Sequence, residues 1–134
     1  SLKKKIKELL KDKYAFEDVG TFSEDSVDYP DFADKAVQLV RQGKVERGVL
    51  ICGSGIGMSI YANKFLDIRC ALVWNDELAK LCRLHNDANM IALPGRFMDP
   101  NVAKICVELF METPFEGGRH QRRLDKIIQY VHQH

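Results

Sequence analysis

Apolar positions along the chain fall into two kinds of segment, short continuous runs and longer stretches with helical spacing. The continuous runs at 48–52, 68–74 and 90–93 have the length and composition of buried parallel strands. Between and around them, helical spacing predicts helices over residues 1–10, 31–42, 58–65, 76–84, 101–112 and 119–132. Alternating polar and apolar residues predict one further short strand at 13–19.

The ends of several predicted helices carry suitable capping residues. Pro30 suits the first turn of the helix at 31–42, and Gly43 ends that helix. Asn75 is a good N-cap for the helix at 76–84. In the first helix, the stripe predicted to be buried consists of Leu2, Ile6, Leu9 and Leu10.

Alternation of strands and helices predicts a three-layer αβα sandwich with a parallel, Rossmann-like sheet. We expect one domain over residues 1–134, a length that can bury a substantial core. A helix precedes the first strand, whereas doubly wound domains usually begin with a strand. We therefore expect either that the first strand is absent from this sequence or that the sheet is one strand short.

The amino-acid composition excludes several classes of protein. The net charge of +1 gives no overall field that would attract nucleic acid, and no apolar run approaches the ~20 residues of a membrane span. No signal peptide precedes the first helix. The four cysteines, Cys52, Cys70, Cys82 and Cys106, lack metal-site spacing and indicate reduced thiols in a cytoplasmic protein. We expect neither a metal nor another cofactor.

The stretch 48–59 combines a strand, a thiol and a glycine-rich turn. Cys52 ends the strand, and the loop Gly53-Ser54-Gly55-Ile56-Gly57 leads into a helix. The spacing is not the dinucleotide fingerprint, and no P-loop Lys follows. The loop instead fits a role as a cradle of N–H groups that binds an oxyanion, with the Ser54 hydroxyl as a further donor. Cys52 is then either a base or nucleophile, favoured by the N–H groups, or a small buried apolar residue.

Other polar residues stand where propensity would favour a simple turn or a solvated face. His85 and Asn86 interrupt the pattern between a helix and a strand, so they are either functional or structural. Arg119 and Arg123 are four residues apart on one helix face, where they bind a phosphate or form an ordinary basic surface. Arg96 follows the end of a strand and could be a third phosphate ligand. A thiol, an oxyanion loop, a histidine and arginines together suit proton transfer beside a carbonyl of a phosphorylated substrate.

At these residues the sequence resembles the type B ribose-5-phosphate isomerases, which are grouped with the galactose-6-phosphate isomerase subunits. The likeness covers nearly the whole chain. Its motifs are residues 28–30 (DYP), 48–59 (GVLICGSGIGMS), 62–64 (ANK), 85–89 (HNDAN), 94–96 (PGR) and 115–123 (FEGGRHQRR). The resemblance implies interconversion of ribose 5-phosphate and ribulose 5-phosphate in the pentose phosphate pathway, without metal.

The resemblance also implies roles for individual residues. Cys52 would be the base that moves a proton between C2 and C1 through a cis-enediolate. Ser54 and the N–H groups of Gly53, Gly55, Ile56 and Gly57 would stabilise that enediolate. His85, with Asn86 beside it, would help to open the sugar ring, and Arg96, Arg119 and Arg123 would bind phosphate.

In the family the site lies between two subunits of a dimer, so His85, Asn86 and Arg96 would serve the neighbour's Cys52. We expect a homodimer, which could pair further into a tetramer. Finding the cysteine, histidine and arginines in one chain favours the homodimeric ribose enzyme over the hetero-oligomeric galactose enzymes.

The chain departs from the family at its start, because the family's first strand and its Asp-His pair are missing. A chain that starts at Ser1 would fold weakly, bind phosphate weakly and turn over little or no substrate. Two alternatives therefore stay open: a non-catalytic phosphosugar-binding or assembly module, and an isomerase of a six-carbon sugar phosphate such as allose 6-phosphate.

Overall fold

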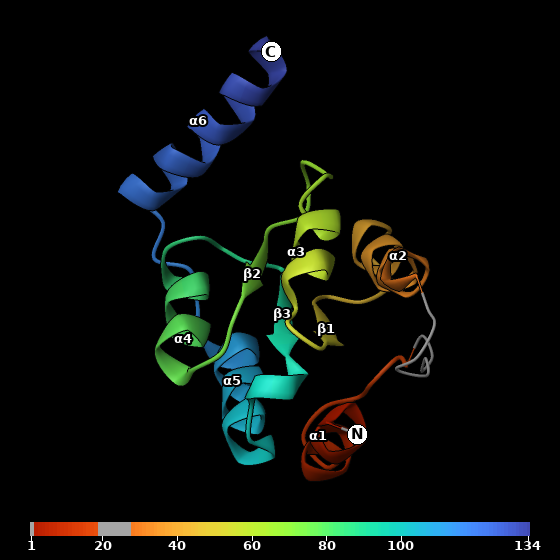
Figure 1. Ribbon diagram of the computed structural model, residues 1–134. Helices are drawn as coiled ribbons and strands as arrows, with labels where there is room; N and C mark the ends of the chain where they lie inside the picture. The colour runs from red at the N-terminus through yellow and green to blue at the C-terminus, as the bar shows by residue number, and fades with distance from the viewer. Residues whose placement is uncertain (1, 19–27) are drawn as a thin grey trace.

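The computed structural model describes residues 2–18 and 28–134, and a parallel sheet lies at its centre (Figure 1). Its three strands are β1 (Gly48–Cys52), β2 (Cys70–Leu72) and β3 (Met90–Pro94), in the order β1-β3-β2. Every residue of the central strand β3 is buried, because this apolar strand packs against helices on both faces. The predicted α/β class is confirmed.

Helices cover both faces of this sheet. They are α1 (Leu2–Leu10), α2 (Tyr29–Arg41), α3 (Ile56–Ala62), α4 (Asp76–Leu84) and α5 (Pro100–Glu112). The described residues also contain a 3-10 turn, η1 (Gly95–Phe97), and a last helix, α6 (Arg119–Gln133). One core cluster joins α1, α4 and α5 to Ile91 and Leu93 of β3. A second joins α2 and α3 to Met90 and Ala92. Successive β3 side chains therefore enter opposite cores, which confirms the three-layer sandwich.

Several local signals act as predicted. The Asn75 side chain accepts a hydrogen bond from the Leu78 N–H at 2.8 Å and caps α4. Pro30 lies in the first turn of α2, which begins two residues before the predicted start at 31. α3 begins and ends earlier than the predicted 58–65, because Gly55 already forms its N-cap.

The predicted strand at 13–19 is wrong over its described part, residues 13–18, which contain no strand. Tyr14 instead donates a hydrogen bond to Glu112, and Asp18 pairs with Lys3 and Lys7 of α1. Residues 15–18 are exposed, and a strand needs a neighbouring strand to satisfy its backbone groups. The last predicted position, residue 19, lies outside the described residues.

Two smaller expectations also need correction. Leu9, predicted to be buried, is 47% exposed, because it lies on the side of α1 that faces a surface hollow shared with the start of α5. β2 covers only three of the predicted residues 68–74, since its pairing with β3 ends at Leu72 opposite Ala92.

The C-terminal helix α6 extends away from the rest of the molecule (Figure 1). Its single buried residue is His120, in the first turn. Four large apolar side chains farther along it are exposed: Ile127, Ile128, Tyr130 and Val131. No helix in the described part of the chain is long and apolar enough to span a bilayer.

Candidate active site

Cys52 lies at the carboxyl end of β1, where the chain enters the glycine loop. Its side chain is half-buried and forms no disulfide. Gly55 takes φ +75°, and a Cβ there would lie 2.8 Å from Leu72 Cδ1 and 3.3 Å from the backbone of Leu93. Only glycine fits both the backbone angle and the space. The loop is therefore held tightly against the end of the sheet.

Tyr29 of α2 packs on the other side of the loop. A Cβ on Gly57 would come within 2.5 Å of the Tyr29 ring, so this glycine permits the close approach. Ser54 Oγ accepts a hydrogen bond from the Ile56 N–H at 3.3 Å, which leaves the hydroxyl proton of Ser54 to donate elsewhere. N–H groups in the first turn of α3 have no acceptor within the helix. The loop and the start of α3 lie directly after Cys52, and their role as a cradle of donors stays a prediction.

Arg96 lies against this loop. Its N–H donates to the Gly53 carbonyl at 3.1 Å, and its side-chain Nε lies 3.1 Å from the position that a Cβ on Gly53 would occupy. Arg96 is exposed and forms no ion pair with any residue that the structure describes. Its positive charge is thus available to an anion next to Cys52.

A cavity of about 270 Å³ opens beside the loop. Its lining residues are Ser54, Ile56, Leu72, Trp74, Pro94 and Phe97. Trp74 and Phe97 are 52% and 76% exposed, so its wall is apolar yet open to solvent. A larger hollow of about 540 Å³ lies between α1 and the start of α5, and none of the predicted site residues lines it.

The other three cysteines differ from Cys52 in their surroundings. Burial raises the pKa of Cys70 to about 12 and the pKa values of Cys82 and Cys106 to about 11. These thiols stay neutral near pH 7 and have no loop of N–H donors at hand. Their environment supports the prediction that they are structural.

His85 follows the last residue of α4, at the opposite end of the sheet. The turn after it is organised by Arg83, which is only 6% exposed. Arg83 donates to the Asp87 carboxylate at 2.8 Å, the Ala88 carbonyl at 2.7 Å and the Thr113 carbonyl at 3.1 Å. Sequence reasoning missed Arg83, because an arginine in a helix gives no sign that it will be buried.

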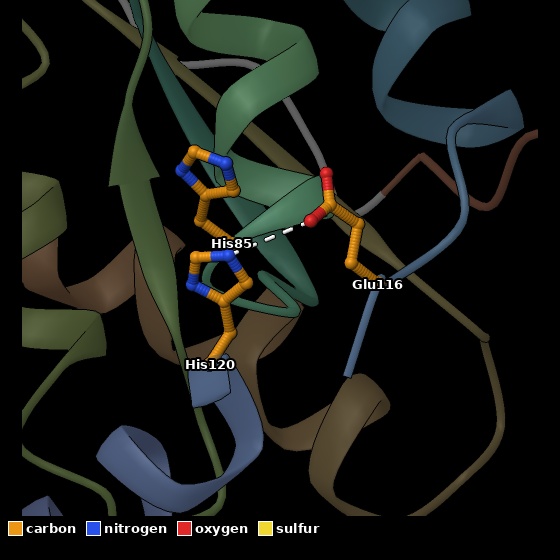
Figure 2. Close-up of side chains that lie close together, drawn as sticks. All are labelled: His85, Glu116 and His120. Carbon is orange, nitrogen blue, oxygen red and sulfur yellow. Dashed lines mark ion pairs between the residues drawn. The ribbon is translucent and has the colours of Figure 1, made fainter. Parts of the chain in front are cut away.

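His120 stacks on His85, with ring centroids 4.2 Å apart and planes inclined by 14°. The loop before α6 is tied to α4, since the Glu116 N–H donates to the Leu84 carbonyl at 3.1 Å. His85, Glu116 and His120 together form a group of potential metal ligands (Figure 2). Their positions in the sequence have no metal-site spacing, so the sequence did not indicate this group.

The predicted phosphate ligands Arg119 and Arg123 are exposed on α6, on either side of His120 in the sequence. Neither forms an ion pair with a residue in the described ranges. Asn86 is also exposed, next to His85. These residues form one group near the amino ends of the strands.

One chain does not bring all the predicted residues together. Cys52 lies opposite Pro94, at the end of β3, whereas His85 precedes Met90, at its start. Four residue steps along β3 separate these edges by about 13 Å. Cys52, Ser54 and Arg96 therefore form a carboxyl-edge group, and His85, Asn86, Arg119 and Arg123 an amino-edge group. Arg96 lies on the loop of its own chain, and the expectation that it joins His85 at a neighbour's Cys52 stays a prediction.

The parallel sheet, the thiol beside a glycine loop and the free arginines define an α/β protein with a candidate site for an anionic substrate. Residues 1–127 match the model of the Ribose/Galactose Isomerase family. The chain belongs to this family.

Individual relatives agree with this assignment. Ribose-5-phosphate isomerase B of Escherichia coli is 42% identical over 110 residues, which cover 82% of this chain and 74% of that protein. A ribose 5-phosphate isomerase of Thermotoga maritima superposes with a TM-score of 0.89 at 49% identity, over 94% and 88% of the two chains. Ribose-5-phosphate isomerase B of Mycoplasma genitalium was solved with bound ribulose-5-phosphate. It superposes with a TM-score of 0.90 at 40% identity, and the match covers 99% of this chain and 90% of that one.

Proposed function

We propose that this protein interconverts ribose 5-phosphate and ribulose 5-phosphate in the cytoplasm, as a step of the pentose phosphate pathway. The proposal treats residues 1–134 as one sugar-phosphate isomerase domain. It is supported by the relatives, among them one that holds ribulose-5-phosphate. The observation that carries it is the Cys52 thiol at a strand end, beside a loop of N–H donors and Arg96.

In the proposed reaction the Cys52 thiolate removes the proton from C2 of the open-chain aldose. The electron pair of that C–H bond forms a C1–C2 double bond, and negative charge develops on the sugar oxygens. Loop N–H groups and the Ser54 hydroxyl stabilise this cis-enediolate. The hydroxyl proton on O2 passes to O1, and the Cys52 thiol returns its proton to C1 while C2 becomes the carbonyl carbon. The thiolate is regenerated, so no cofactor is consumed.

The amino-edge group opens the sugar ring and binds the phosphate. His85, assisted by Asn86, transfers the protons that open the furanose ring, because an imidazole can both give and take a proton near neutral pH. Arg119 and Arg123 hold the phosphate, with guanidinium groups that match its oxygens. Together they would fix the sugar with its C1–C2 end toward Cys52.

The two groups meet only if a second copy of the chain contributes. A homodimer that sets the carboxyl edge of one copy against the amino edge of the other would complete two sites. The exposed apolar side chains of α6, such as Ile127 and Val131, support this arrangement because a projecting amphipathic helix needs a partner surface. Pairs of such dimers could assemble further into a tetramer.

A six-carbon sugar phosphate is the second candidate substrate, since the family description includes galactose isomerases. Substrate length depends on the distance between Cys52 and the phosphate-binding arginines of the partner copy. Comparing turnover of ribose 5-phosphate and allose 6-phosphate separates the two candidates. The five-carbon sugar should give the higher kcat/KM.

Proton transfer can be followed directly by NMR in D₂O with ribose 5-phosphate as substrate. We expect ribulose 5-phosphate to appear with deuterium at C1, because a thiol that exchanges with solvent returns the proton. Binding of the sugar without conversion would contradict the proposal and indicate a phosphosugar-binding module. Conversion that needs an added metal ion would contradict the mechanism.

A further inference from the structure

Three metal-ligating side chains converge where α6 joins the body of the protein. His85 comes from the end of α4, Glu116 from the loop before α6, and His120 from the first turn of α6. One ligand atom of each lies within 4.8 Å of the other two. Figure 2 shows the Glu116 carboxylate beside the two stacked imidazole rings.

His120 is the residue that points to a ligand. It is only 6% exposed, and its Nε2 is buried without a hydrogen-bond partner. Glu116 Oε2 lies 3.5 Å from Nε2, at the limit of hydrogen-bond distance and without suitable geometry. A buried polar atom without a partner carries a desolvation cost, which a bound metal ion would offset. Imidazole nitrogens are common metal ligands.

We propose that His85, Glu116 and His120 bind a divalent transition-metal ion of the Zn²⁺ class. Two imidazoles and one carboxylate are a ligand set that Zn²⁺ accepts, with water as the fourth ligand. Tetrahedral coordination requires donor atoms about 3.3 Å apart, so the widest of the three separations must shorten by up to about 1.5 Å, whereas Glu116 Oε2 already lies 3.5 Å from His120 Nε2. Glu116 can supply this movement, because its side chain is 50% exposed in a loop.

Metal binding at this group would fix α6 to the body. The helix otherwise projects from the molecule, with one buried residue at its base. The ion would bridge the end of α4, the loop before α6 and the first turn of α6, and set the direction in which Arg119 and Arg123 point. It would also occupy a His85 lone pair and inhibit the isomerase, a consequence that rests on the proposed function.

The test is a titration of the chelator-treated full-length protein with Co²⁺, followed by visible absorption, with Zn²⁺ as competitor. We expect one equivalent of Co²⁺ per chain, displaced by Zn²⁺, with no thiolate-to-cobalt band. Glu116→Gln and His85→Asn should each weaken binding at least tenfold. Glu116→Gln keeps shape and exposure at an exposed position, so the test does not depend on a buried substitution.

Two exposed histidines at the end of the chain provide the control. His132 and His134 could bind a metal by themselves, and His132→Asn with His134→Asn should leave the affinity unchanged. Binding lost in that control, binding unchanged in Glu116→Gln and His85→Asn, a thiolate band, or no binding at 1 mM Co²⁺ would each overturn the proposal. Because the readout is metal binding, a chain without isomerase activity still answers the question.

Discussion

The two edges of the sheet carry groups of different character. At the carboxyl edge, Cys52 and its loop are fixed by close contacts with Leu72, Leu93 and Tyr29. At the amino edge, Arg119 and Arg123 stand exposed on a helix that leaves the body (Figure 1). Under the proposed function this difference would divide the work: the closely packed edge would carry out proton transfer, which needs fixed geometry, and the projecting helix would reach the phosphate of a substrate bound at another copy.

Removing the thiol tests the carboxyl edge most strongly. Cys52→Ala should lower kcat for ribose 5-phosphate by about 10³-fold or more, because no other group replaces the base. Binding of the sugar phosphate should change little, since the arginines remain. Cys106→Ala removes a buried thiol far from the loop and should keep kcat per folded molecule. Steady-state kinetics with both variants decide the matter, and full activity in Cys52→Ala would exclude Cys52 as the base.

Removing a guanidinium tests the amino edge. Arg119→Ala and Arg123→Ala should each raise KM for ribose 5-phosphate by about tenfold or more and lower kcat less, because phosphate binding is shared by ground and transition states. Arg122→Ala changes a neighbouring exposed arginine on the same helix and serves as the matched control. An equal rise in KM for all three variants would show a general charge effect instead of a phosphate site.

Rigidity of the carboxyl edge can be measured by comparing two glycines with the same backbone angle. Gly43 has φ +72° and open space around it, whereas Gly55 has φ +75° and close neighbours. Gly43→Ala should lower the free energy of unfolding by about 1 kcal/mol from backbone strain. Gly55→Ala should lower it by about 1–3 kcal/mol more, from overpacking against Leu72 and Leu93. If urea unfolding shows the same loss of free energy of unfolding in both variants, the loop shifts to make room for the added methyl group and is not rigid.

The smallest effect concerns His120 at the amino edge. Burial lowers its pKa below the ordinary value of 6.5, so the unfolded chain takes up a proton at a higher pH than the folded chain. Its contribution to stability is therefore complete above about pH 6.5 and decreases as the pH falls. The free energy of unfolding of His120→Asn should fall less than that of the unchanged chain between pH 7.5 and 5.5. His132→Asn should show the full decrease.

Sequence patterns predicted the parts of this molecule that are decided by local chemistry. β1 has the predicted bounds of 48–52, because a run of small and apolar residues ends in a glycine turn. The bounds of α4 follow from the Asn75 cap and the break after Leu84. The glycine loop was recognised from its spacing, and the structure gives the close contacts that require glycine at positions 55 and 57.

Features that depend on distant partners were not predictable in the same way. The alternation at 13–19 resembles a strand, but alternation cannot show whether a neighbouring strand is available. Arg83, Glu116 and His120 gave no signal of their own, since their roles arise from contacts made by separate elements. The resemblance names candidate site residues, whose roles stay predictions, and only the sheet register shows that Cys52 and His85 lie at opposite edges.

Mixing two inactive variants tests the shared site most directly. Cys52→Ala and His85→Asn chains, unfolded together and refolded as a mixture, should form mixed dimers in which one site has both an intact Cys52 and an intact His85. With random pairing the mixture should recover about a quarter of the unchanged activity, because half of the dimers are mixed and each has one working site. Activity no higher than that of the separately refolded variants would contradict a site built from two copies.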